Sequence, residues 1–218
     1  MSLPAAYLGI ILIWSTTPLA IQWSTEGAGF AFAVLARMAI GTLVAGLLVL
    51  VGRVGFPLHA RARRAYLSGG VGLFGAMALT YWGARYVNSG LVAVLFGLSP
   101  LFAAILAALF LGEQALTPAR LAGTLLGAAG LGVIFVHGDS LGGEHALAGL
   151  VALLAAVLVY SGSLVSLKHI GDDSPPLATT VGTLSVALPF FALLCLLSYG
   201  RIAAAIPPRA VAAIASLG

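Results

Sequence analysis

The sequence contains seven runs of about 20 predominantly apolar residues, the length of α-helix that crosses the hydrocarbon core of a bilayer. The runs cover residues 3–21, 29–51, 66–83, 91–111, 117–136, 146–167 and 176–198. A further apolar stretch follows Arg209 and reaches Gly218. The connections between runs are short, as expected for antiparallel neighbours in one bundle. The sequence therefore predicts an all-α fold, a polytopic transmembrane helix bundle.

Composition excludes several other classes of protein. Only 7% of the residues are charged and 61% are hydrophobic, whereas soluble domains carry about 25% charged residues. The net charge of +4 comes largely from one loop rich in arginine, so we predict no nucleic-acid partner. A single cysteine, Cys195, excludes a disulfide framework and a thiolate metal site. We predict no catalytic residue, no metal and no cofactor.

The basic residues near the ends of the runs predict the orientation in the membrane. The side that holds the N-terminus carries Arg53, Arg61, Arg63, Arg64, Arg120 and Lys168, and the opposite side carries Arg85, Arg201 and Arg209. Because cytoplasmic loops are richer in Lys and Arg, the N-terminus is predicted to be cytoplasmic. We expect a multi-pass protein of a bacterial inner membrane, with the lipid bilayer as a partner.

Two segments predict an internal repeat. Residues 8–15 and 154–161 align Trp14 with Tyr160 and Ser15 with Ser161. Apolar helices match one another easily, so the residue match alone is weak. The position of the match strengthens the evidence for a repeat, because the two copies begin the first and the sixth run. The second copy begins five spans after the first, and because five is odd it lies in the membrane with the opposite orientation. Inverted repeats are typical of transporters, with the substrate site near the midplane.

Two prolines interrupt the backbone hydrogen bonds of apolar runs. Pro18 leaves the carbonyl of Trp14 without its helical donor, and Pro100 does the same to Phe96, beside Ser99. In lipid, a carbonyl freed in this way must find protein, cavity water or a ligand. Each proline is open to two interpretations, either a tolerated kink within tight packing or a break that lines a pocket and permits movement.

Arg37 is the charged residue that lies well inside a run. A charged side chain at the bilayer centre costs about 2.5–3.5 kcal/mol on insertion scales, so it should face the bundle interior or water. Two roles are open for Arg37, namely binding an anionic group such as a carboxylate and bracing helices through backbone carbonyls. No Asp or Glu lies in the middle of a run, so a carboxylate proton relay is not expected.

Several motifs together resemble the EamA-like family of the drug/metabolite transporter superfamily. They are the stretch of residues 13–21 around Trp14 and Pro18, Arg37 with the two residues after it, residues 81–102 from Tyr81 through Ser99 and Pro100, and residues 111–113, which end at Glu113. The resemblance implies ten helices arranged as two inverted five-helix repeats. The first repeat would cover residues 1–137. The second would cover residues 144–218 and stop after the start of its third helix, so that seven to eight helices are present.

The resemblance also implies a function and a site. Family members export or exchange small metabolites, including amino acids, by alternating access. On this basis we expect Trp14, Ser15, Tyr81, Ser99 and Tyr160 on the wall of a substrate cavity, with Arg37 as an anion contact. Pro18 and Pro100 would act as helix breaks, and Glu113 would have a structural role. A homodimer is left open.

Two alternatives belong to other classes of protein. A membrane-embedded enzyme acting on a lipid-linked substrate would need clustered acids or histidines at one membrane face. His169, Asp172 and Asp173 are the candidates, although their position before two prolines is more simply a turn. The other alternative is a packing or regulatory membrane protein that transports nothing.

Overall fold

The computed structural model describes residues 30–112 and 145–203, together with isolated positions between residues 8 and 21 and between 118 and 130. For residues 199–203 it describes the backbone alone. The helices are α2 (Phe30–Val51), α3 (Ala60–Gly83), α4 (Ser89–Phe96), α5 (Ser99–Leu111), α7 (Ala146–Ile170) and α8 (Pro176–Ala203). Every regular element in this part of the chain is a helix, which confirms the all-α prediction. Trp14, Ser15 and Glu113 lie outside the described residues.

Four helical segments are long and apolar enough to cross a membrane. They are Phe30–Val51, Ser89–Leu111, Ala146–Ile170 and Pro176–Ser198. On α2, Leu43, Leu47 and Leu50 are each at least 60% exposed, which suits side chains that face lipid. The chain is therefore a multi-pass membrane protein. The predicted runs at residues 3–21 and 117–136 fall largely outside the described residues.

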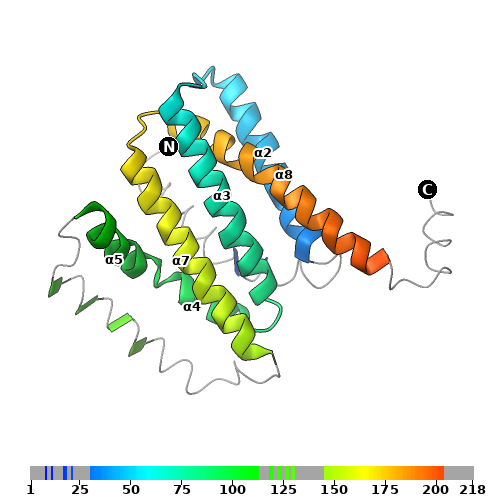
Figure 1. The fold of residues 1–218 in the computed structure, drawn as a ribbon, viewed down its shortest axis with the longest axis vertical. Helices are drawn as coiled ribbons and strands as arrows, with labels where there is room; N and C mark the ends of the chain where they lie inside the picture. The colour runs from blue at the N-terminus through cyan, green and yellow to red at the C-terminus, as the bar shows by residue number, and fades with distance from the viewer. Residues whose placement is uncertain are drawn as a thin grey trace.

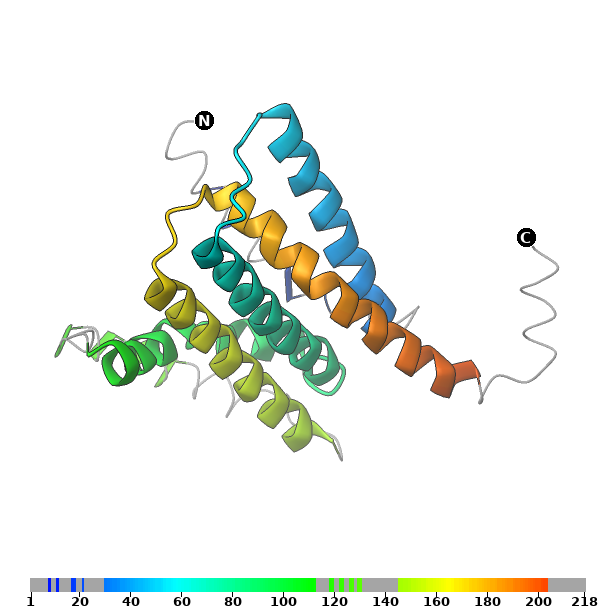
Figure 2. The ribbon, with the colours of Figure 1, turned by 45° about the horizontal axis from the view of Figure 1, so that its top comes forward.

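Helix α3 lies at the centre of the bundle, where it packs against both α7 and α8 (Figures 1 and 2). Glycines make this close packing feasible. A side chain at Gly70 would collide with Val186 on α8, and one at Gly72 would collide with Ser163 on α7. Because its glycine face touches protein, α3 needs less apolar side-chain surface than the helices that face lipid.

The structure corrects the start of α3. We predicted an apolar run from residue 66, but the helix begins six residues earlier, at Ala60. His59 caps it, because its Nδ1 accepts a hydrogen bond from the backbone N–H of Ala62 at 3.2 Å. The apolar pattern missed this first turn and a half because it carries three exposed arginines.

One end of the bundle gathers the basic side chains. The loop between α2 and α3 and the loop between α7 and α8 both lie there, at the top of Figure 1. This end, called the basic end below, holds Arg53, Arg61, Arg63, Arg64 and Lys168, all exposed. Arg85 follows α3 at the opposite end.

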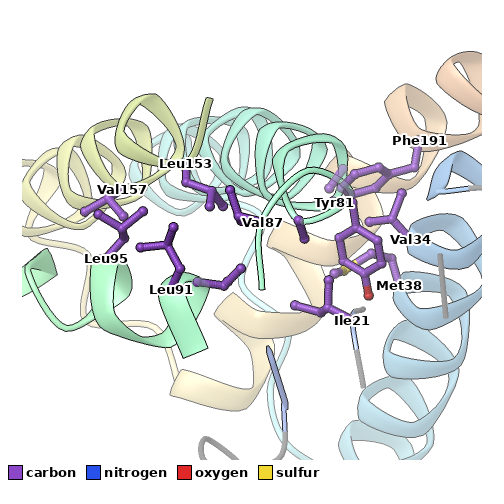
Figure 3. Packing of buried hydrophobic residues seen from close by; sticks show 13 residues of the cluster. Ile21, Val34, Met38, Tyr81, Val87, Leu91, Leu95, Leu153, Val157 and Phe191 are labelled. Carbon is purple, nitrogen blue, oxygen red and sulfur yellow. The ribbon is translucent and has the colours of Figure 1, made fainter. Parts of the chain in front are cut away.

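The buried core joins the two halves of the chain (Figure 3). Tyr81 of α3 meets Val34 of α2 and Phe191 of α8 in one part of it. Leu153 and Val157 of α7 face the apolar side chains of α4 in the other part. The helices α2, α3 and α4 from the first half of the chain and α7 and α8 from the second half all contribute to the core, so it holds the described bundle together as one unit.

The predicted run at residues 91–111 is two helices rather than one. α4 ends at Phe96 and α5 begins at Ser99, with Pro100 in its first turn. The carbonyl of Phe96, which Pro100 cannot pair with, accepts a hydrogen bond from the Ser99 hydroxyl at 2.6 Å. A serine beside the proline thus satisfies the freed backbone group, and Gly97 and Leu98 form a turn between the two helices.

Candidate functional site

A cavity of about 620 Å³ lies among α2, α3, α4, α7 and α8. Its described lining consists of Thr17, Pro18, Ile21, Arg37, Met38, Gly41, Leu73, Met77, Thr80, Val92, Ala93, Phe96, Gly97, Tyr160 and Leu184. These residues lie around the middle of the bundle and toward the end opposite the basic end. A volume between 300 and 1,000 Å³ is typical of small-molecule sites.

Arg37 is the one charged residue in the described lining. Its Nη1 donates a hydrogen bond to the hydroxyl of Tyr81 at 3.4 Å, and Tyr81 is only 1% exposed. Within residues 30–112 and 145–203, the one ion pair closer than 4 Å joins His59 to Asp172. In the described structure the guanidinium therefore faces the cavity with a tyrosine behind it and without a carboxylate partner.

The rest of the described wall is mostly apolar. Met38 and Met77 contribute flexible thioether side chains, which adapt to ligands of different shape. Phe96 at the end of α4 and Tyr160 of α7 lie with their ring centroids 6.0 Å apart. The hydroxyl of Thr80 is turned back to the carbonyl of Ala76 at 2.7 Å. The arrangement suits a ligand with one anionic group and an apolar body.

The expected site residues separate into two groups in the structure. Arg37, Tyr160 and Pro18 belong to the cavity lining. Tyr81 and Ser99 are buried and are not part of the described lining. Tyr81 accepts a hydrogen bond from Arg37, and Ser99 donates one to the backbone at the helix break. Pro100 stands in the first turn of α5.

Sequence reasoning missed Ser161 as a residue of interest. Ser161 on α7 is fully buried, and its hydroxyl donates to the backbone oxygen of Ser99 at 3.1 Å. The hydrogen bond ties α7 to the start of α5, next to the cavity residue Tyr160. The signal was present, because the repeat comparison aligned Ser161 with Ser15, but a hydroxyl in an apolar helix does not reveal its partner.

Comparison with protein-family models matches residues 4–136 to the EamA-like transporter family. The chain belongs to this family. The matched region includes Arg37, Tyr81, Ser99 and Pro100. Tyr160 lies beyond the EamA-like match, in the part of the chain that supplies α7 and α8.

A curated relative of this EamA-like chain comes from Streptantibioticus cattleyicolor and is named a probable terminal-alkyne amino-acid exporter. The two proteins are 30% identical over 154 residues, which cover 68% of this chain and 49% of the relative. The match thus spans about half the length of the relative. No solved structure matches the chain.

Proposed function

We propose that the protein exports or exchanges small metabolites such as amino acids, by alternating access to the cavity around Arg37. The observation that carries the proposal is a single described cation facing a mostly apolar cavity of about 620 Å³. Membership of the EamA-like family and the name of the curated relative support transport rather than catalysis. Both findings favour a transporter over a membrane-embedded enzyme.

In this proposal Arg37 binds the carboxylate of the substrate. An arginine presents planar N–H donors that match a carboxylate, and the hydroxyl of Tyr81 holds the Nη1 side of the guanidinium. The substrate side chain would then contact Met77 and Phe96, which line the same cavity. Trp14 and Ser15 keep their proposed place on the wall, by resemblance to the family.

The breaks at Pro18 and Pro100 are proposed as points where helices move. α4 and α5 are already separate helices. Their junction is held by short backbone turns at Gly97 and Leu98 together with the hydroxyls of Ser99 and Ser161. A junction of this kind can reorient at a smaller cost than an unbroken helix. Movement there would open the cavity to either side in turn.

The proposed topology follows the charge distribution. We place the basic end in the cytoplasm of a bacterial cell, because its five described Lys and Arg side chains are those expected inside. We also propose the division into repeats, with residues 1–137 forming the first and residues 144–218 belonging to the second. α2 and α8 then occupy corresponding positions in the two repeats, and they pack against each other.

The test measures flux of radiolabelled amino acids in reconstituted vesicles. We expect Arg37→Gln to lower flux at least tenfold, because a carboxylate in the cavity would lose its counter-charge. Arg85→Gln is the matched control. Arg85 lies over the rings of Phe30 and Tyr86 at the end of the bundle opposite the basic end, and it is outside the described lining of the cavity. Trp14→Ala tests the first helix in the same assay. Equal flux in the wild type and in Arg37→Gln would refute the proposed site.

A further inference from the structure

A second polar cluster lies at the basic end, away from the cavity. Asp172 in the loop between α7 and α8 has a side chain that is only 4% exposed. Neither of its carboxylate oxygens has a hydrogen-bond partner in the described structure. A buried carboxylate is costly unless a counter-charge or donor lies nearby. The basic side chain that lies against it in this part of the chain is His59, whose Nε2 is 3.7 Å from Asp172 Oδ1.

The cap of α3 determines how His59 faces this carboxylate. Its Nδ1 accepts the hydrogen bond from Ala62, so the proton of the imidazole resides on Nε2, which faces Asp172. His59 is also fixed to α3 through its loop. The Tyr66 hydroxyl donates to the carbonyl of Pro57 at 2.9 Å, and the ring of Phe56 stacks on Tyr66 at 5.4 Å. His59 is therefore attached to α3, whereas Asp172 belongs to the loop that joins α7 to α8.

The same end of the bundle is closed by direct contact between helices. The hydroxyls of Ser68 on α3 and Ser166 on α7 lie 2.7 Å apart. A side chain at Gly69 would meet Thr183 of α8 at 2.8 Å, well inside normal contact distance. The cavity lies beyond this packed region, toward the opposite end. Separation of α3 from α7 and α8 would open a path from the cavity to the basic end, and it would part both Ser68 from Ser166 and His59 from Asp172.

We propose that His59 and Asp172 form the latch of a gate at the basic end. The pair holds the α2–α3 loop against the α7–α8 loop and so stabilises the state in which the cavity is closed on that side. The latch rests on the proposed function, because a gate matters only if the cavity opens to both sides. It adds residues at the bundle end to those proposed in the cavity.

The test measures closure by a disulfide rather than by transport. Ser68→Cys with Ser166→Cys, made with Cys195→Ala, places two thiols where the hydroxyls now lie 2.7 Å apart. The rate of cross-linking by a mild oxidant, in vesicles of the full-length protein, reports the closed state. His59→Asn removes the imidazole N–H that faces Asp172 but keeps a side chain that caps helices well, and Asp172→Asn removes the negative charge but keeps the shape of the carboxylate. We expect each to slow cross-linking about three- to tenfold.

Two further variants complete the test. The exchange His59→Asp with Asp172→His keeps a capping residue at position 59 and again places an imidazole opposite a carboxylate, so it should return the rate to within about twofold of the parent. Asp173→Asn, at the exposed neighbour, should leave the rate unchanged. Unchanged cross-linking in both single variants would overturn the latch, as would failure of the exchange in a protein that melts at the parent temperature. Cross-linking needs no substrate, so this result is independent of the flux test on Arg37.

Discussion

The hydroxyl of Ser161 donates a hydrogen bond to the backbone oxygen of Ser99, at 3.1 Å and in a fully buried position on α7. The bond connects the late part of the chain to the point where α4 and α5 separate. Ser99 itself donates to Phe96 at 2.6 Å. Ser99 thus satisfies the Phe96 carbonyl, which Pro100 leaves without its helical donor and which lipid could not solvate, and Ser161 adds a donor from α7 to the backbone oxygen of Ser99.

Removing this hydroxyl should loosen the junction. We expect Ser161→Ala to lower the free energy of unfolding by about 0.6–1.5 kcal/mol, the range for a side-chain hydrogen bond in a protein or membrane interior. Thermal unfolding in detergent measures the change. Ser185→Ala is the control, because Ser185 is exposed on α8 and should change the melting temperature little. A melting temperature that falls equally in both variants would contradict a specific role for Ser161.

The tyrosine behind Arg37 should affect substrate binding more than folding. Tyr81→Phe keeps the buried ring but removes the acceptor of the 3.4 Å hydrogen bond. A loss of about 1 kcal/mol of substrate binding free energy corresponds to about a fivefold rise in KM for a carboxylate substrate. We expect the maximal rate to stay unchanged. Tyr86→Phe removes a similar contact, from Arg85 at 3.3 Å, outside the described cavity lining. An equal KM in wild type and Tyr81→Phe would show that Tyr81 does not support binding.

Space in the cavity should select substrates by size. Ala93 lines the cavity and is exposed. The substitution Ala93→Leu therefore places three more carbons inside the cavity and reduces its free volume. We expect flux of large apolar amino acids to fall at least fivefold and flux of alanine to fall less. Ala148→Leu makes the same change at an exposed position near the start of α7. Equal loss for large and small substrates would argue against a role of Ala93 in size selection.

The glycine face of α3 should tolerate no added methyl group. Gly72→Ala would place a Cβ against the side chain of Ser163, and overpacking of this kind costs about 1–3 kcal/mol. Gly46→Ala, on α2, meets nothing within 4 Å and should be neutral or stabilising by up to about 1 kcal/mol, because alanine favours the helix. The yield of folded protein and its melting temperature distinguish the two variants. Similar stability in both would mean that α3 and α7 can separate without cost.

The sequence by itself determined the fold class and much of the helix placement. The constraint is strong because a chain in lipid must form long apolar helices that satisfy their own backbone. For a related reason, the position of Arg37 inside an apolar run is enough to predict that its side chain faces the interior of the bundle, since lipid cannot solvate a charge. Proline chemistry likewise predicted that Phe96 would need a new hydrogen-bond donor. These are local properties that a single segment carries with it.

Only the tertiary structure decided which segments meet. Apolar helices are chemically alike, so their sequences do not specify that α3 lies between α7 and α8. The partners of Arg37, Ser161 and His59 are 44, 62 and over 100 residues away along the chain. The sequence around a hydroxyl or an imidazole does not indicate which distant group it will contact. The start of α3 was also missed, because a capping histidine and surface arginines interrupt the apolar pattern. Packing between distant helices brought these groups together, and it therefore determined the candidate site and the proposed latch.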